Sequence, residues 1–517
     1  MLDFSRLGTL PGLLTYHAET QPERIATEFE GRKTSYQALH ARADRLARTL
    51  LALDPEPHSR IAYLGKNSDH YFELLFATAK AGKVLVPLNW RLTQGEWSYI
   101  LDDAQVGYLF TDNEFAAAGT ALAQRLLLTA VSPLQDSWDY LIKHTRANVL
   151  FGTVTASDVV LQIYTSGTTG KPKGTLLSHT NVLALREPGL RANLEWFPRA
   201  CDTSLVVMPV AHIAGTAYGL FGLHSGGRLV ICREFNAQQV WHQLAHAGVT
   251  HMLLAPTALR MLLEASTTDA CAPHLRYVTY GGSPIAPSVL QQALARLKCG
   301  LAQMYGMTET AGGVVALTPR DHDSGQLELL GCAGRAMLGV ELGIIDAEGT
   351  FVDNAEVGEI VIRSEAVMAG YWRQPEATAD AFTTQGWLRT GDLGWLDTNG
   401  YLTVVDRAKD TIVTGGENVY PLEVEHRLLE HASVHDVAVI GIPSERWGEE
   451  VKAIVVPVDL DRFDSASLLA YARLHLAAYK VPKSVELAAE LPRNAGGKVL
   501  RRALREPYWT NHVKRVG

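Results

Sequence analysis

The sequence predicts an α/β protein with a large N-terminal domain and a smaller α+β C-terminal domain. Three observations support this prediction. Short apolar runs alternate with helical patterns across residues 205–304, which is typical of parallel βαβ units. After Gly391 the pattern changes to shorter strands and fewer helices. A chain of 517 residues also exceeds the roughly 250–300 residues at which a single hydrophobic core stops growing.

The middle of the chain is expected to form the parallel sheet. Strands are predicted at residues 205–208, 229–232, 250–254, 275–280 and 301–304. Asn236 is a favoured N-cap for the first intervening helix, and Gly248 lies just past its end. Further helices are predicted from residue 257 and at residues 286–297. Strands that alternate with helices in this way predict βα layers.

The C-terminal part is predicted to be a separate α+β domain. Strands are expected at residues 402–406, 411–413, 437–442 and 451–458. Pro421 suits the first position of a helix, and a longer helix is predicted at residues 465–478. A charged segment without apolar periodicity at residues 406–410 marks the boundary. We therefore expect domains at residues 1–405 and 406–517.

Composition limits the class of protein. The formal net charge of -8 argues against non-specific nucleic-acid binding, which needs a basic surface. The five cysteines are scattered without a CxxC pair, which favours reduced, mostly buried thiols. The N-terminus lacks the pattern of a signal peptide, and no run approaches the roughly 20 apolar residues of a membrane span. A cytoplasmic protein with no membrane span and no nucleic-acid partner is expected.

One loop, residues 164–174, has the composition of a phosphate site. It holds three glycines, four hydroxyl side chains besides Tyr164, and two lysines. Glycines let backbone N–H groups turn toward an anion, and lysines add charge. The spacing differs from a Walker loop. A flexible surface loop is the other interpretation, but both flanks, residues 159–163 and 175–177, have strand patterns. This loop and the one after Met304 follow predicted strands, where α/β sheets bind ligands.

The loop also resembles the phosphate signature of the adenylate-forming superfamily, which includes acyl- and aryl-CoA synthetases, peptide-synthetase adenylation domains and luciferases. Six further motifs occur in the order of that family, so the resemblance covers essentially the whole chain. They lie at residues 304–310, 358–363, 389–392, 406–410, 415–418 and 494–498. The resemblance implies a large domain of layered βα sheets with a small β-rich part, and a mobile C-terminal domain.

The resemblance implies ATP, Mg²⁺ and coenzyme A as cofactors or co-substrates and a small-molecule carboxylic acid as substrate. Lys498 would bridge the acid and the α-phosphate, Thr308 would contact that phosphate, and Glu309 would bind the metal. As a lone residue, Glu309 would instead suggest a solvated loop carboxylate. The implied ATP contacts are Thr165, Ser166, Gly167, Thr168, Thr169, Gly170, Lys171, Lys173, Gly281, Gly282, Ser283, Tyr305, Gly306, Asp392 and Arg407.

The remaining implied roles concern the acceptor and the acid. Lys409 matches the hinge about which the small domain rotates between adenylation and thioester formation. The implied CoA contacts are Gly415, Gly416, Trp447, Tyr479 and Lys480. A Trp buried at the domain edge is the other interpretation of Trp447. The implied acyl contacts are His212, Ile213, Gly281 and Gly312.

Ile213 restricts the class of acid. Amino-acid-activating relatives have an aspartate at this position to hold the substrate ammonium, and an apolar side chain offers it no partner. We therefore expect an acid without an α-amino group: a medium- or long-chain, bulky cyclic or aryl carboxylate. The predicted activity is that of an AMP-forming acid–thiol ligase that transfers to CoA, as a monomer or homodimer. Loading of a carrier protein is the alternative; a luciferase-like oxygenase and a non-catalytic nucleotide or acyl sensor are more remote.

Overall fold

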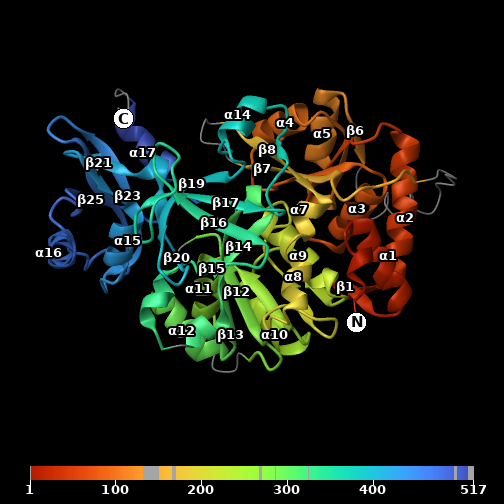
Figure 1. Ribbon diagram of the computed structural model, residues 1–517, viewed down its shortest axis with the longest axis horizontal. Coiled ribbons are helices and arrows are strands. Elements are labelled where there is room, and N and C mark those ends of the chain that lie inside the picture. Colours follow the sequence, from red (N-terminus) through yellow and green to blue (C-terminus); the bar gives the residue numbers. More distant parts are fainter. Residues whose placement is uncertain are drawn as a thin grey trace.

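The computed structural model describes residues 2–131, 151–165, 171–266, 271–283, 285, 287–323, 325–493 and 498–510. Three sheets form the large domain and a fourth forms the small domain. Figure 1 shows the small domain, in blue, at one end of the molecule, next to β19 (Leu388–Leu396). The predicted α/β fold with a separate small domain is confirmed.

The first sheet contains seven strands in the order β18-β8-β7-β4-β3-β5-β6. Their bounds are β18 (Gly370–Tyr371), β8 (Lys173–Ser178), β7 (Val159–Thr165), β4 (Val84–Leu88), β3 (Arg60–Leu64), β5 (Val106–Thr111) and β6 (Thr129–Val131). Strands β7 and β8 flank the phosphate loop and pair antiparallel, with Thr165 opposite Lys173. The loop therefore connects the two strands of a hairpin.

The second sheet contains nine strands in the order β15-β14-β13-β12-β11-β9-β10-β1-β2. Their bounds are β15 (Arg335–Ala336), β14 (Gly312–Leu317), β13 (Gly300–Met307), β12 (Tyr277–Gly281), β11 (His251–Leu254), β9 (Thr203–Val206), β10 (Arg228–Ile231), β1 (Ile25–Phe29) and β2 (Arg32–Ser35). The five predicted strands are all present, and their pairings with one another are parallel. Strand β13 then pairs antiparallel with β14.

Helices cover these sheets and fill the layer between them. They are α1 (Leu10–Thr20), α2 (Tyr36–Leu53), α3 (Asp69–Lys80), α4 (Gln94–Asp103), α5 (Ala116–Leu126), α7 (His179–Leu183), α8 (Arg186–Arg191), α9 (Ile213–His224), α10 (Ala237–His246), α11 (Pro256–Glu264), α12 (Pro287–Leu297), α13 (Pro319–Asp323) and α14 (Pro375–Asp380). The Asn236 side chain accepts a hydrogen bond from the backbone of Gln239 and caps α10 as predicted. Residues of α3 and α9 share one core cluster with strands of both sheets.

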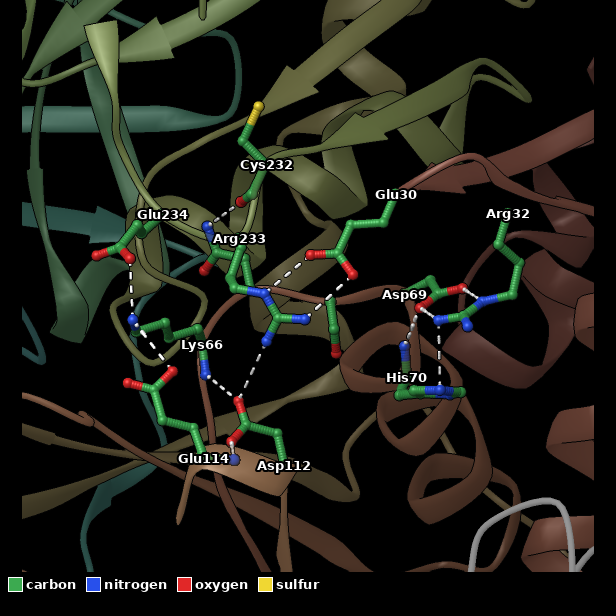
Figure 2. A network of polar contacts seen from close by, with 12 residues as sticks. Glu30, Arg32, Lys66, Asp69, His70, Asp112, Glu114, Cys232, Arg233 and Glu234 are labelled. Atoms are coloured by element: carbon green, nitrogen blue, oxygen red, sulfur yellow. Dashed lines mark hydrogen bonds and ion pairs between the residues drawn. The ribbon is translucent and has the colours of Figure 1, made fainter. Parts of the chain in front are cut away.

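A network of ion pairs joins the two sheets where their strands end (Figure 2). Lys66, which follows β3, pairs with Glu234 at 2.9 Å and with Glu114 at 3.2 Å. Arg233, which follows β10, pairs with Glu30 at 2.9 Å and lies 3.8 Å from a carboxylate oxygen of Asp112. Each of the two cations contacts acidic residues from more than one segment, so the network fixes the carboxyl ends of both sheets relative to each other.

A third, four-stranded antiparallel sheet is the β-rich part implied by the family resemblance. It comprises β16 (Val340–Ile345), β17 (Gly358–Ser364), β19 and β20 (Leu402–Arg407). Strand β20 continues two residues past the predicted boundary at residue 405, because Arg407 still pairs with Asp392 of β19. A short 3₁₀ turn, Ala408–Asp410, follows directly.

The small domain is built on a five-stranded sheet with flanking helices. Its elements are β21 (Ile412–Thr414), β22 (Glu417–Val419), α15 (Pro421–Leu429), β23 (Val434–Ser444), β24 (Gly448–Pro457), α16 (Ser465–His475), β25 (Ser484–Leu487) and α17 (Arg501–Trp509). Pro421 begins α15 as predicted. The predicted end of α16 at residue 478 is wrong, because Leu476 is already extended. Arg260 of α11 donates a hydrogen bond to the His435 carbonyl at 3.1 Å, which links the two domains.

Two expectations from composition are tested by the fold. None of the helices within the described ranges is long and apolar enough to cross a bilayer. All five cysteines lie in the described ranges and are free thiols. Only Cys232 among them is buried, so the expectation that most are buried is wrong. Cys299 packs partly buried against a core cluster, whereas Cys201 and Cys271 are exposed.

Candidate active site

Three of the predicted nucleotide contacts meet at the junction of β13, β19 and β20. The Tyr305 hydroxyl donates a hydrogen bond of 2.8 Å to Oδ2 of Asp392. Arg407 Nε lies 3.1 Å from Oδ1 of the same carboxylate. Burial and the Asp392 charge raise the pKa of Tyr305 well above its usual range. The phenol therefore stays protonated and donates to Asp392, which leaves the buried carboxylate oriented by two partners.

Lys498 lies in the same neighbourhood, although its segment belongs to the small domain. Burial and the positive charge of Arg407 lower its pKa to about 8, and the Asp392 carboxylate acts in the opposite direction. Charges that shift a pKa must be close to the group. Lys498 therefore lies within electrostatic range of the Asp392–Arg407 pair.

Glu309 occupies a buried turn directly after β13. It belongs to a 3₁₀ turn, Thr308–Thr310, whose three residues are all buried. The Tyr371 hydroxyl donates a hydrogen bond of 2.9 Å to Oε1 of Glu309. Burial raises the pKa of Glu309, and the Tyr371 hydroxyl opposes that change. A desolvated carboxylate with one oxygen fixed by a donor is well placed to meet a cation.

The residues here fit a magnesium ion. Mg²⁺ is usually held by one or two carboxylates together with substrate phosphates, and Glu309 offers a hard oxygen ligand beside the nucleotide residues. No cluster of three or more metal-ligating side chains occurs in the part of the chain that the structure describes.

The turn that carries Thr308 and Glu309 depends on close backbone packing. A Cβ atom at Gly306 would lie 2.0 Å from the carbonyl oxygen of Gly312. Ala311 and Gly312 both have positive φ, 50° and 119°. These features bend the chain sharply between β13 and β14, so Thr308 and Glu309 sit at the corner rather than within a strand.

The ends of the phosphate loop are placed, whereas Ser166, Gly167, Thr168, Thr169 and Gly170 lie outside the described residues. Lys173 Nζ lies 5.1 Å from the centre of the Tyr371 ring, and Lys171 Nζ lies 5.7 Å from the Tyr99 ring. Strand β18, which carries Tyr371, pairs with β8 so that Tyr371 is opposite Thr175. Tyr371 therefore contacts both Lys173 of the phosphate loop and Glu309.

The predicted glycines at the end of β12 lie beside the Tyr305 segment. Gly281 is opposite Met304 of β13, and a Cβ at Gly281 would lie 2.2 Å from the Met304 carbonyl oxygen. Gly282 has φ of 88°, which favours glycine. Ser283 follows at the end of the described stretch. This backbone approaches the Tyr305 strand as closely as glycine allows.

The predicted acyl residues converge on the start of α9. His212 is the N-cap, and its Nδ1 accepts a hydrogen bond of 3.3 Å from the Ala214 backbone. Burial lowers the pKa of His212, so the imidazole is neutral. Ile213 is buried in the main core. A Cβ at Gly312 would lie 3.6 Å from the Ala217 side chain, which places Gly312 against the next turn of the same helix.

The predicted CoA residues fall into two groups in the small domain. The Gly415 N–H donates to the Trp447 carbonyl at 2.8 Å, and Trp447 is 42% exposed, so it is not a buried residue at the domain edge. Gly416 follows with φ of 86°. Lys480 forms an ion pair of 2.6 Å with Glu423 of α15, and its ammonium lies 5.7 Å from the Tyr479 ring. Lys409 lies in the turn Ala408–Asp410.

Tyr371 is the site residue that sequence reasoning missed. Its position depends on the pairing of a two-residue strand with β8, and a Gly-Tyr dipeptide gives no local signal of that pairing. The backbone of the same segment supports the site as well, because the Met368 N–H donates to the Glu309 carbonyl at 2.8 Å.

Comparison with known proteins gives matches along the whole chain. The family model of the AMP-binding enzyme matches residues 14–372, and that of the AMP-binding enzyme C-terminal domain matches residues 423–498. The fatty acid–acyl-carrier-protein ligase ScoC of Streptomyces coeruleorubidus is 38% identical over 517 residues, which are 100% of this chain and 99% of that protein. A feruloyl-CoA synthase of Amycolatopsis is 38% identical over 502 residues, 95% of this chain and 97% of that protein.

Solved structures agree with these sequence matches. The o-succinylbenzoate coenzyme A synthetase of Bacillus subtilis, in complex with ATP and a magnesium ion, has a TM-score of 0.84 and 30% identity to this chain. The alignment covers 95% of this chain and 98% of the other.

Proposed function

This chain belongs to the AMP-binding enzyme family, and from that premise we propose that it joins a carboxylic acid without an α-amino group to ATP and passes the acyl group to coenzyme A. The general activity is ATP-dependent acid–thiol ligation. One observation carries the proposal: Tyr305, on the strand that leads into Glu309, and Arg407 both contact the Asp392 carboxylate. The charges of Asp392 and Arg407 in turn act on Lys498 of the small domain.

In the first half-reaction, a carboxylate oxygen of the acid attacks the α-phosphorus of ATP and pyrophosphate leaves. Asp392 has acceptor oxygens suited to the two ribose hydroxyls, and Tyr305 and Arg407 hold it in place. Lys498 supplies a positive charge between the acid and the α-phosphate, where negative charge accumulates. With a pKa of about 8, most of this ammonium is charged at neutral pH.

Glu309 and the phosphate loop would act on the β- and γ-phosphates, which leave as pyrophosphate. Glu309 would hold Mg²⁺, and the ion, when bound, supplies charge that neutralises phosphate oxygens. Thr308 lies on the same buried turn and offers a hydroxyl to the α-phosphate. Lys171 and Lys173 stand at the end of the phosphate loop and offer their charges to the β- and γ-phosphates.

In the second half-reaction, the thiol of the acceptor attacks the acyl carbon and AMP leaves. We propose that the small domain, which follows β20, rotates at Lys409, so that Lys498 withdraws and the Gly415–Trp447 pair approaches the acyl adenylate. The exposed indole of Trp447, held to Gly415 by a backbone hydrogen bond, is a surface against which a pantetheine arm can pack. Tyr479 and Lys480 would face the nucleotide end of CoA.

A carrier protein is the second candidate acceptor. The relative named as a fatty acid–acyl-carrier-protein ligase matches the full length of this chain at 38% identity. Both acceptors present a thiol on a phosphopantetheine arm, so the chemistry at the acyl carbon is the same.

A panel of carboxylic acids assayed for pyrophosphate release, with and without CoA, tests the proposal. Acid-dependent ATP–pyrophosphate exchange together with CoA-dependent turnover is expected. If exchange occurs but turnover requires a phosphopantetheinylated carrier protein rather than CoA, the carrier protein is the acceptor. No exchange with any acid would refute the adenylation itself.

A further inference from the structure

Arg186, the first residue of α8, is a buried cation beside the predicted acyl site. One terminal nitrogen of its guanidinium donates a hydrogen bond of 3.1 Å to the Ala217 carbonyl. The guanidinium carbon lies 4.7 Å from the centre of the Phe221 ring. Its Nε atom is buried without a hydrogen-bond partner in the described part of the chain. The contacts that hold Arg186 are thus a carbonyl and an aromatic face on α9.

No carboxylate is paired with Arg186 among the residues that the structure describes. The neighbouring Glu187 instead pairs with Arg191 at 2.6 Å. Burial alone lowers the pKa of Arg186, to about 10, without a compensating acidic group. His224, on the same helix as Phe221, is kept neutral by burial and by the Arg186 charge. Buried charges in proteins are normally paired. Arg186 has no such counter-charge among the described residues.

Arg186 nevertheless remains within reach of a small molecule. It is desolvated enough for its pKa to fall, yet the residue is only half-buried. An anion that reached this side chain would meet a guanidinium whose one hydrogen bond within the described residues is to the Ala217 carbonyl.

Arg186 contacts the helix on which the predicted acyl residues lie. Ile213, Ala217 and Phe221 are spaced by four residues and so share one face of α9. Gly312 packs against Ala217, and Arg186 bonds to the carbonyl of that same residue. At 1.5 Å per residue, the contacts of Arg186 lie roughly 6–12 Å along the helix from Ile213.

We propose that Arg186 binds a second carboxylate at the far end of the acid, so that the preferred substrate is a medium-length dicarboxylic acid. This inference rests on the proposed adenylation activity. The first carboxylate would meet Lys498 at the α-phosphate, and the second would pair with Arg186 along α9. A planar guanidinium suits bidentate recognition of a carboxylate.

The test compares kcat/KM for dicarboxylic acids and for monocarboxylic acids of the same chain length, in the wild type, Arg186→Met, Arg186→Lys and Arg191→Met. The wild type is expected to prefer the dicarboxylic acids. Arg186→Met should lose roughly 10- to 100-fold on them, the effect of one buried charged hydrogen-bonding partner, and lose nothing on monocarboxylic acids. Arg186→Lys should retain part of the preference. Arg191→Met removes an exposed arginine of the same helix and should behave as wild type.

The outcomes separate this inference from the proposed function. Exchange with no acid of the broader panel would refute adenylation, whereas exchange with that panel but with neither of these series would refute the role of Arg186 alone. Exchange with monocarboxylic acids, at an efficiency equal to or above that for dicarboxylic acids in the wild type, would refute the role of Arg186 alone. This comparison needs no variant, so it decides the matter even if Arg186→Met does not fold. If the wild type prefers dicarboxylic acids but Arg186→Met keeps that preference, another residue recognises the second carboxylate.

Discussion

The hydroxyl of Tyr371 donates a hydrogen bond of 2.9 Å to Oε1 of Glu309, and the ring of the same tyrosine lies 5.1 Å from Lys173 Nζ. The phosphate loop and the proposed metal ligand are therefore connected through one side chain. This relationship arises because β18 adds to the edge of β8, which brings residue 371 beside residues 173 and 309.

Tyr371→Phe removes the donor and keeps the ring. We expect the affinity for Mg²⁺·ATP to fall roughly tenfold, the effect of one hydrogen bond to a charged group, because Glu309 loses the contact that orients it. Calorimetric titration with Mg²⁺·ATP in the absence of acid measures the effect. Tyr401→Phe is the matched control, since it removes a hydrogen bond from a tyrosine to Asp321 elsewhere in the fold. Equal affinities of wild type and Tyr371→Phe would show that the tyrosine has only a packing role.

Lys498→Ala is expected to lower acid-dependent ATP–pyrophosphate exchange about 100- to 1,000-fold, by analogy with the loss of other oriented charge-stabilising donors. ATP binding should change much less, because Asp392 and Glu309 remain. Lys483→Ala removes an exposed lysine of the same domain and serves as the control. Normal exchange in Lys498→Ala would contradict the assignment.

The pKa of about 8 for Lys498 predicts an alkaline limit to adenylation. The ammonium is charged below that pKa and neutral above it, so kcat/KM for ATP should decline as the pH rises through about 8. Lys498→Arg keeps its charge and should show a flat profile over the same range, at a lower absolute rate. A decline of the same shape in Lys498→Arg would assign the limit to another group.

Gly306→Ala places a methyl group against the Gly312 carbonyl, 2.0 Å from where the Cβ would stand. Backbone must move to admit it, and we expect the free energy of unfolding to fall by about 1–3 kcal/mol, with loss of adenylation because Thr308 and Glu309 are displaced. Chemical denaturation and the exchange assay measure the two effects. At Gly107 nothing lies within 4 Å of the added atom, so Gly107→Ala should be nearly neutral in both.

Lys409→Pro tests the proposed hinge by fixing one backbone torsion in the turn Ala408–Asp410. Pyrophosphate release in the first turnover should persist, and transfer to the thiol should be impaired. Rapid-quench measurement of the two half-reactions separates them. Equal loss of both halves, or of neither, would argue against rotation at this residue.

The sequence predicted those parts of the fold that depend on local chemistry. Asn236 caps α10 and Pro421 begins α15 because capping and proline geometry act within a few residues. The predicted end of α16 was wrong because the residues directly after His475 include no glycine or proline to mark where the helix stops. The recognised motifs located Asp392, Arg407 and Lys498, but not their mutual contacts.

Tyr371 and Arg186 could not be found in the sequence, for a related reason. Each acts across elements far apart in the chain: Tyr371 through the pairing of β18 with β8, and Arg186 through its contact with α9. The cost of burying an unpaired arginine becomes visible only when its surroundings are known.

The ion pairs of Lys66 with Glu234 and of Arg233 with Asp112 cross between the two large sheets and have a mechanical consequence. The sheets cannot slide past each other at their ligand-binding edge without breaking both contacts. These contacts tie the two sheets of the large domain together, so the proposed change of shape between the two half-reactions falls to the turn that follows β20, where the chain crosses from one domain to the other.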